Sequence, residues 1–280
     1  MDSKLIKITI ITPVLNGEKT LQKTIDSIFC QNYPYVEYII VDGLSTDKTH
    51  EIIKFNNKKI SKILIGKDKN LYDAMNKGIK VAQGEIIGIL NADDYYEKKT
   101  LDLVSKTYEL SSKKNIIIYG DMFNEYREKK VVSKGDLSDF AIKSGNFIIN
   151  HPSLFVSKLL YNNIGLYDIK YSSGADREFV LRAYSSKANF LKIKKPLATF
   201  RLGGFTSSYS IKIIINRAVE EFNIFKKYNT KSFALKKSFE QFYRMTRNMF
   251  LRYICGHDKF LKLRINRMSK KWLRFQIFYS

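Results

Sequence analysis

Short apolar runs alternate with amphipathic stretches over the first 120 residues. Continuous apolar runs are typical of buried strands, whereas apolar residues that recur every three or four positions indicate helices packed on one face. The runs predict strands at Ile8–Val14, Val36–Val41, Ser61–Ile65, Ile86–Leu90 and Asn115–Tyr119. The stretches between them predict helices at Thr20–Phe29, Asp47–Phe55, Leu71–Ala82 and Thr100–Leu110. This order predicts an α/β fold with a mainly parallel central sheet flanked by helices.

The pattern becomes mixed after residue 120 and purely helical after about residue 205. Strands are expected at Phe147–Ile149, Ser153–Val156 and Phe190–Phe200, with a helix beginning near Ala175. Gly203, Gly204 and the polar run 206–208 favour a boundary there. We therefore expect one domain over residues 1–205, with halves at about 1–120 and 121–205, and a basic helical C-terminal region over 206–280.

The net charge of +22 predicts an anionic partner, which could be nucleic acid, an acidic membrane surface or a phosphorylated substrate. The charge gathers at the end of the chain, where residues 211–280 hold 17 Lys and Arg against four acids. Cys30 and Cys255 are widely separated and favour free thiols in a reducing compartment. With neither a signal-peptide pattern nor an apolar run of about 18 residues, we expect a cytoplasmic protein.

Carboxylates follow the strand predicted at Ile86–Leu90, in the segment Asn91-Ala92-Asp93-Asp94. Ligands of open α/β sheets bind outside the carboxyl ends of the strands, so acids placed there can hold a divalent cation and, through it, a diphosphate. The alternative is a solvated turn in which Asp94 caps the next helix.

Three other segments occupy the same setting at strand ends or helix starts: Ile11–Gly17, Ile40–Asp47 and Asn70–Gly78. In the first, Thr12 offers a hydroxyl and Pro13 a rigid turn, against the alternative of a plain strand-to-helix turn. In the second, Asp42 can accept from a base or ribose, while Ser45-Thr46-Asp47 favours helix capping. In the third, Asp73 and Asn76 share one helix face, which could simply be exposed and polar.

Together these motifs resemble the inverting family 2 glycosyltransferases with the GT-A fold, over residues 7 to about 202. The resemblance implies that the nucleotide sugar contacts Thr12, Pro13, Asn16, Asp42, Asp73, Asn76, Asn91 and Asp93. It also places Asn91–Asp94 at the family's metal-binding motif, so that Asp93 and Asp94 would bind Mg²⁺ or Mn²⁺ with Asn91 as a neutral ligand at most. Met75 stands where the commonest pattern has an Arg, which removes one phosphate contact.

An inverting transfer needs a base for the acceptor hydroxyl, and the resemblance points to Asp176 in the segment Gly174–Arg182. Ala175 replaces the Glu often found there. Glu178 is the rival, but it lies about 200° around the helix from Asp176, so only one of them can face the pocket. An acid that merely favours the helix dipole is the alternative. His151 and Glu178 are also possible contacts of the acceptor or the diphosphate, although His151 could be a structural histidine.

The last segment predicts a basic amphipathic helix, with apolar residues at Leu261, Ile265, Met268, Trp272, Phe275 and Tyr279. Such a helix can lie in an anionic membrane interface, or its apolar stripe can pack onto the main domain. The family's acceptors are often polyprenyl-diphosphate-linked glycans, so the resemblance favours a peripheral protein on the inner face of the membrane.

The sequence thus predicts a metal-dependent glycosyltransferase of surface polysaccharide or lipopolysaccharide assembly, with a nucleotide-sugar donor and a glycan or polyprenyl-diphosphate-linked acceptor. A nucleotidyltransferase is the second hypothesis, but it needs a Gly-rich, basic loop after the first strand, and Thr12–Gly17 holds one Gly and no cation. A nucleic-acid-binding protein would need aromatic platforms interleaved with the charge across the main domain. We see none and expect no nucleic acid partner.

Overall fold

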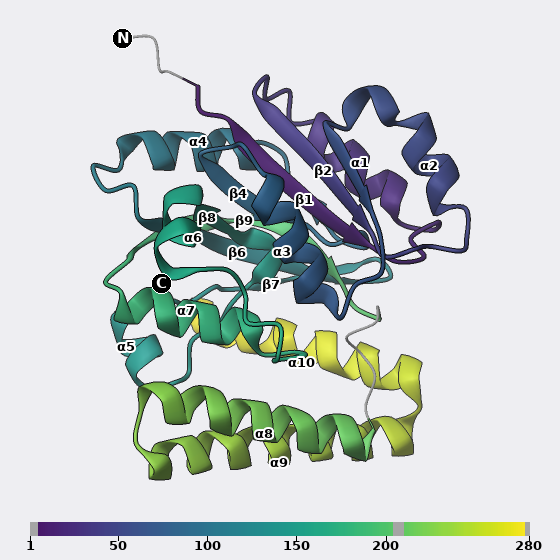
Figure 1. The fold of residues 1–280 in the computed structure, drawn as a ribbon. Helices are drawn as coiled ribbons and strands as arrows, with labels where there is room; N and C mark the ends of the chain where they lie inside the picture. The colour runs from purple at the N-terminus through teal and green to yellow at the C-terminus, as the bar shows by residue number, and fades with distance from the viewer. Residues whose placement is uncertain (1–4, 204–209, 278–280) are drawn as a thin grey trace.

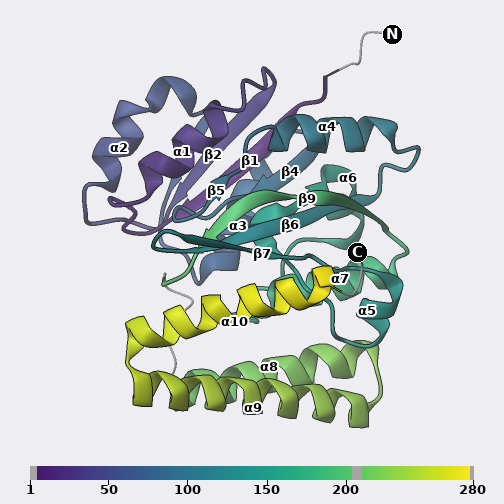
Figure 2. The same ribbon diagram turned by 180° about the vertical axis from the view of Figure 1, so that it is seen from behind.

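The computed structural model describes residues 5–203 and 210–277, with side chains up to residue 269. In this part of the chain one mixed sheet is covered by helices on both faces (Figure 1 and Figure 2). Its strands follow the order β3-β2-β1-β4-β8-β6-β9-β5, and β7 pairs with β6. The strands are β1 Ile8–Val14, β2 Val36–Asp42, β3 Lys62–Ile65, β4 Ile86–Ile89, β5 Tyr95–Tyr96, β6 Ile116–Tyr126, β7 Lys129–Ser133, β8 Leu154–Ser157 and β9 Asn189–Arg201.

The N-terminal half of the sheet is parallel, because β1 pairs in parallel with β2 and β4, and β2 with β3. Its helices are α1 Leu21–Phe29, α2 Thr49–Phe55, α3 Leu71–Val81 and α4 Thr100–Leu110. The prediction of these strands and helices is confirmed to within about two residues at each end, the usual uncertainty of element boundaries. The register sets Val14 beside Asp42, so the loops after β1 and β2 leave the sheet at one edge.

Antiparallel pairs enter the sheet in its second half, where β8 lies between β4 and β6 and β7 pairs with β6. The strand predicted at Phe147–Ile149 is wrong: Ile148 forms only a single bridge with Asp136. Phe147 is buried as a core residue without a partner strand, and an apolar run alone does not separate the two cases. The short helices α5 Asp139–Lys143 and α6 Lys158–Ile164 were not expected; α7 Ala175–Ser185 was.

The two faces of the sheet carry separate cores. Residues of β1 alternate between them, with Ile8 and Ile10 facing α1 and α4 and Ile11 facing α3 and α7. Gly78 allows α3 to approach β1 closely, because a Cβ there would lie 2.5 Å from a methyl carbon of Ile11. This contact fixes α3, whose first turn begins at the same edge as the β1 and β2 loops.

Three helices follow: α8 Ile211–Tyr228, α9 Lys231–Cys255 and α10 His257–Ile277. The expected boundary near residue 205 lies outside the described residues. Ile224, Phe225 and Ala234 are fully buried in the same core cluster as α7, so the antiparallel pair α8 and α9 packs directly against the α/β body. None of the helices within residues 5–203 and 210–277 has the length and apolar composition needed to cross a membrane.

The apolar stripe of α10 packs on the sheet rather than facing outward. Leu261 and Ile265 are each 1% exposed and contact Val131 of β7 and Leu202. For these residues, the expected membrane-facing orientation is therefore wrong: they cover the apolar surface of a sheet-edge strand, which needs protection from water. Trp272, Phe275 and Tyr279 lie beyond the described side chains.

Candidate active site

Hydrogen bonds join the loop after β1 to the loop after β2. The backbone N–H of Asn16 donates to the Ser45 hydroxyl at 2.8 Å, and Thr46 N–H donates to the Asn16 amide oxygen at 2.8 Å. The next two backbone N–H groups of the first loop donate to Thr49 and Asp47 at 2.8 and 3.0 Å. The predicted capping role of Asp47 agrees with its acceptance from Thr49 N–H at 3.0 Å. The two loops therefore form one cross-linked platform at the sheet edge.

Asp42 ends β2 beneath this platform and is fully buried. Its Oδ1 accepts from the backbone N–H and hydroxyl of Ser45, at 3.0 and 2.6 Å. Its Oδ2 has no hydrogen bond within the described chain and lies 3.4 Å from Nε2 of His50. A buried acceptor without a partner is costly, so this oxygen suits a donor group of a ligand or of His50. The sequence analysis did not single out His50.

Thr12 lies in the core rather than at the platform. Its side chain is fully buried, and its hydroxyl has no hydrogen bond in the part of the chain described. Pro13 beside it is buried as well. The side chain lies on the sheet face of Ile8 and Ile10, because odd and even positions of β1 face the two cores. The expected contact between Thr12 and a nucleotide stays a prediction.

Asp73 and Asn76 both lie in α3 but have different surroundings. Asp73 accepts from the backbone N–H of Lys69 at 3.0 Å and remains partly exposed in the first turn of α3. The amide of Asn76 donates to the carbonyl of Tyr167 at 2.8 Å and accepts from its N–H at 3.1 Å. The Asn76 amide thus holds the loop before α7, and its expected contact with the donor stays a prediction.

The segment Asn91–Asp94 forms a tight turn fixed from α1, because the Thr24 hydroxyl donates to the carbonyls of Ala92 and Asp94 at 3.0 and 2.7 Å. Asp93 is partly exposed, whereas Asp94 is 1% exposed and accepts from the N–H of Arg201 at 3.2 Å. Oδ1 of Asn91 and Oδ2 of Asp94 are buried and have no hydrogen bond to the described residues.

This turn offers only oxygen donors, the kind that Mg²⁺ and Mn²⁺ prefer. Burial raises the pKa of Asp93, and burial together with the nearby Asp93 charge raises the pKa of Asp94 well above its usual value. A bound cation would offset the cost of burying these charges and their mutual repulsion. Asn91 Oδ1 and Asp94 Oδ2 have no hydrogen bond to the described residues, so the residues fit a divalent metal. Residues 5–203 and 210–277 contain no group of three or more His, Cys, Asp or Glu arranged for a metal, so the diphosphate would have to complete the coordination. Asp93 is the accessible carboxylate of the expected pair, and Asp94 faces inward.

Asp176 lies in the first turn of α7 and is partly exposed. It contacts Tyr72 of α3, in the N-terminal half of the domain. Its Oδ1 accepts from the Tyr72 hydroxyl at 3.2 Å and from Arg177 N–H at 2.8 Å. Both described hydrogen bonds use Oδ1. Since α3 begins at the edge that carries Asp73, this contact brings Asp176 to the side of the sheet where the loops after β1 and β2 lie.

Glu178 points the other way and is not available to an acceptor. It is fully buried, and its carboxylate binds Arg182 at 2.9 Å, Lys227 at 2.7 Å and the Tyr228 hydroxyl at 2.7 Å. The expectation that only one of the two acids faces the pocket agrees with these contacts. The expected contact between Glu178 and the acceptor or diphosphate is wrong, because the side chain ties α7 to α8.

Replacing Glu178 by Gln should therefore lower the free energy of unfolding by about 2 kcal/mol, because Arg182 and Lys227 lose their buried ionic partner. The loss is limited because Lys227 keeps access to water. Chemical denaturation of the variant measures this. Glu128→Gln removes an exposed acid and should change stability by less than about 0.5 kcal/mol. Equal stability of both variants would contradict the role assigned to Glu178.

The effect of Glu178→Gln should also depend on pH. Despite burial, hydrogen bonds from Lys227 and Tyr228 and the charge of Arg182 leave the Glu178 pKa below its usual value. The unfolded chain then takes up a proton on Glu178 at a higher pH than the folded one, so the carboxylate stabilises the fold above the ordinary Glu pKa of about 4.3. As pH falls through the lowered pKa, we expect the stability difference from wild type to shrink. A difference that grows on acidification would contradict this.

His151 begins a short 3-10 turn before β8, and its ring lies 6.4 Å from that of Tyr167. Both ring nitrogens are buried without a hydrogen bond to the described residues. Burial lowers the His151 pKa, and the charge of Asp176 opposes this effect. His151 therefore lies near enough to the expected base to feel its charge, and its contact with the diphosphate or acceptor stays a prediction.

Two further residues belong to this edge and were not expected from the sequence. Asp68, between β3 and α3, pairs with Lys77 at 2.6 Å and lies next to Gly43 of the β2 loop. The rule that found Asp42 and Asp93, an acid after a parallel strand, would have found it. Arg201 ends β9, and its charge acts on Asp93 and Asp94. Nothing in the local pattern of Arg201 indicates this position, because it depends on the pairing of β5 with β9.

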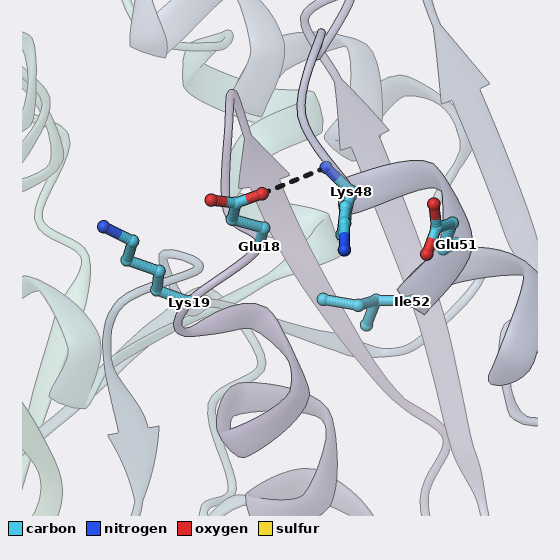
Figure 3. Close-up of a pocket in the computed structure, with 5 residues that line it drawn as sticks. All are labelled: Glu18, Lys19, Lys48, Glu51 and Ile52. Atoms are coloured by element: carbon cyan, nitrogen blue, oxygen red, sulfur yellow. Dashed lines mark hydrogen bonds between the residues drawn. The ribbon is translucent and has the colours of Figure 1, made fainter.

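A cavity of about 440 Å³ opens on the outer side of the platform (Figure 3). Figure 3 shows Glu18 accepting from the backbone N–H of Lys48, at 3.3 Å, with Lys19, Glu51 and Ile52 around it. These residues differ from those assigned to the donor and the metal. A second cavity, of about 610 Å³, lies between α5 and the end of α7, and its lining likewise contains none of the assigned residues. We therefore place the candidate site at the carboxyl ends of the parallel strands, where Asp42 and Asp93 lie, and not at either cavity.

Comparison with known sequences assigns a family. The profile of "Glycosyl transferase family 2" matches residues 9–157. A PGL/p-HBAD biosynthesis glycosyltransferase of Mycobacterium bovis is 32% identical over 184 residues, covering 64% of this chain and 70% of that protein. A dolichyl N-acetyl-alpha-D-glucosaminyl phosphate 3-beta-D-2,3-diacetamido-2,3-dideoxy-beta-D-glucuronosyltransferase of Methanococcus voltae is 28% identical over 233 residues, covering 76% and 70%.

Solved structures support the fold. TarS 1–349 of S. aureus, in complex with UDP-GlcNAc, superposes with a TM-score of 0.62 at 20% identity, covering 78% of this chain and 67% of that one. The mannosyltransferase PcManGT of Pyrobaculum calidifontis, in complex with GDP-Man and Mn2+, superposes with a TM-score of 0.59 at 14% identity, covering 99% and 85%. The predicted α/β fold of the GT-A type is confirmed. The chain therefore belongs to glycosyl transferase family 2 and is a glycosyltransferase.

Proposed function

We propose that this enzyme transfers a sugar, with inversion, from a nucleoside diphosphate donor to a hydroxyl of a glycan or a lipid-linked acceptor. The observation that carries the proposal is the contact between Asp176 of α7 and Tyr72 of α3, at 3.2 Å. It joins a candidate base to the edge that holds Asp42 and Asp73. Family membership favours sugar transfer over the nucleotidyltransferase and nucleic-acid hypotheses.

The N-terminal half of the domain would position the nucleotide-sugar donor. The unpartnered Oδ2 of Asp42 would accept from the base or ribose, and the cross-linked platform, with Asn16 in it, would form the wall beside them. Asp93, with Asn91 and Asp94, would hold Mg²⁺ or Mn²⁺, which when bound supplies a Lewis acid for the departing diphosphate. Support for the metal comes from the oxygen-only donor set and from the Mn2+ in the PcManGT complex.

The transfer step assigns the proton to Asp176. The acceptor oxygen forms a bond to the anomeric carbon, the bond from that carbon to the diphosphate oxygen breaks, and the hydroxyl proton passes to the Asp176 carboxylate. The hydroxyl of Tyr72 and the N–H of Arg177 hold Oδ1, so we assign the proton to Oδ2. His151, whose ring nitrogens are buried without a hydrogen bond to the described residues, would line the acceptor side.

We propose a role in surface polysaccharide or lipopolysaccharide assembly. Two relatives are named for glycan or glycolipid chemistry, and the Methanococcus voltae protein is named for a dolichyl-linked sugar phosphate. These names support a lipid-borne acceptor. The sugar and the base of the donor are left open by the geometry.

A screen of nucleotide sugars with Mn²⁺, scored by release of nucleoside diphosphate, tests the proposal. We expect one donor to be hydrolysed slowly by water alone and faster when a lipid-phosphate-linked glycan is added. EDTA should abolish the release. Turnover of a nucleoside triphosphate with a sugar phosphate instead would favour the nucleotidyltransferase hypothesis.

A further inference from the structure

One face of α9 exposes large apolar side chains to solvent. Seven of them lie between residues 235 and 254, with exposed fractions from 40% to 87%. We call this set the outward stripe: Leu235, Phe239, Phe242, Tyr243, Phe250, Tyr253 and Ile254. At 100° per residue all seven fall within a sector of about 120°. Ala234 and Met245, which are buried, lie on the opposite side of the helix.

The outward stripe points away from the body of the protein. α8 and α9 form a hairpin at the end of the molecule opposite α1 and α2 (Figure 1 and Figure 2). Its inner side joins the core through Ile224, Phe225 and Ala234. An exposed row of aromatic residues over several helical turns marks an interaction surface, because scattered single residues are the usual pattern on a soluble protein.

The charges beside the stripe select its partner. Lys236 and Arg247 border one edge of the stripe and Lys231 the other, and all three are exposed. Over residues 211–255 there are ten Lys and Arg and three Glu.

Two of the three acids of the hairpin face the body: Glu220 accepts from Ser172 and Ser173, and Glu221 pairs with Arg177 at 3.4 Å. Glu240 pairs with Lys237. A second copy of this chain would bring like charges together at the stripe, whereas anionic lipid headgroups would complement them.

We propose that the outward stripe of α9 docks on an anionic lipid bilayer, with its aromatic residues in the interface and its flanking cations among the headgroups. The geometry matches an interfacial amphipathic helix, with apolar and basic residues in adjacent sectors. The membrane contact that the sequence suggested for α10 is thereby assigned to α9, whose outward stripe is exposed, whereas Leu261 and Ile265 of α10 are buried against the sheet.

Docking would leave α8 and α9 between the candidate base and the lipid. Gly174, before the first turn of α7, packs on Ile224 of α8, and Arg177 pairs with Glu221. Asp176 therefore sits one helix layer from α9. This consequence alone rests on the proposed function: a lipid-linked acceptor would have to extend past α8 and α9 to reach Asp176.

Vesicle binding by the full chain tests the docking without donor or acceptor. Wild type should sediment with vesicles of phosphatidylcholine and phosphatidylglycerol, less with phosphatidylcholine alone, and less at high salt. The double variant Phe239→Ser, Phe250→Ser should lower the partition coefficient about tenfold or more. The matched control Phe55→Ser, Phe140→Ser removes two exposed rings elsewhere, 84% and 82% exposed, and should bind as wild type does.

A charge variant and the oligomeric state complete the test. Lys236→Glu with Arg247→Glu keeps the apolar stripe and should abolish the preference for anionic vesicles. Equal vesicle binding by wild type and the Phe239, Phe250 variant would overturn the proposal. So would a wild-type dimer that this variant converts to a monomer, because the stripe would then be a self-interface. Diphosphate release without vesicles is measured separately, so a failed activity assay leaves the docking result readable.

Discussion

Asp176→Asn should lower kcat by about 10³-fold while leaving the dissociation constant of the donor unchanged. Asn cannot take the acceptor proton, and general bases contribute about 10²–10⁴-fold. The variant keeps the shape of the side chain and its acceptor for Tyr72 and Arg177, so the local structure should persist. Steady-state transfer to the acceptor gives kcat, and titration with the nucleoside diphosphate gives binding.

Asp139→Asn is the matched control for Asp176. Asp139 is an acid in the first turn of a helix too, but it is exposed and pairs with Lys143 of its own helix at 2.9 Å. If Asp176 acted only through the helix dipole, the two variants would have similar, small effects of below about 1 kcal/mol on stability and none on kcat. A fully active Asp176→Asn enzyme would remove Asp176 from the mechanism.

Asp93→Ala should lower kcat/KM by about 100-fold and weaken the stimulation of activity by Mn²⁺. Asp93 is the accessible carboxylate of the Asn91–Asp94 turn, and loss of a metal that stabilises a leaving diphosphate costs several kcal/mol. The unfolding free energy should not fall, since burial raises the Asp93 pKa and charging it costs the fold energy. Binding of nucleoside diphosphate with and without Mn²⁺ separates the loss of metal from a general loss of affinity.

Asp26→Ala controls for the charge alone. Asp26 is an exposed acid on α1, the helix that fixes the Asn91–Asp94 turn through Thr24. We expect this variant to keep both activity and Mn²⁺ dependence. If Asp93→Ala retains full Mn²⁺-stimulated turnover, the metal is held elsewhere or is not used.

The parallel half of the fold could be predicted because its signals are local. Each strand from Ile8 to Ile89 is a short, mostly apolar run with a polar residue or Gly within the next two positions, and each helix has one apolar face. The positions of Asp42 and Asp93 follow from the same pattern, since an acid after a parallel strand lies at a known edge. The placement of Asp176 rests on the family resemblance, and its contact with Tyr72 joins residues 104 positions apart.

The surroundings of several site residues could not be predicted, because they depend on distant parts of the chain. Thr12 lies within β1, which is buried on both faces, so the pattern does not show which way its hydroxyl points. The role of Asn76 depends on Tyr167, 91 positions away. The apolar stripe of α10 has the same periodicity whether it covers a sheet or a membrane. Its packing against Val131 of β7, which lies far away in the sequence, shows that Leu261 and Ile265 cover the sheet.

The cross-linked platform has a thermodynamic consequence for donor selection. Because Asn16, Ser45 and Asp47 already hold the two loops together in the free protein, these loops have little conformational entropy left to lose when a nucleotide arrives. The proposed donor site would therefore be preorganised, and these two loops would not need to close over the nucleotide. If this platform is the wall of the donor site, as proposed, it would discriminate among bases by shape and hydrogen-bond matching, because the cross-linked loops cannot adjust to a nucleotide that does not fit.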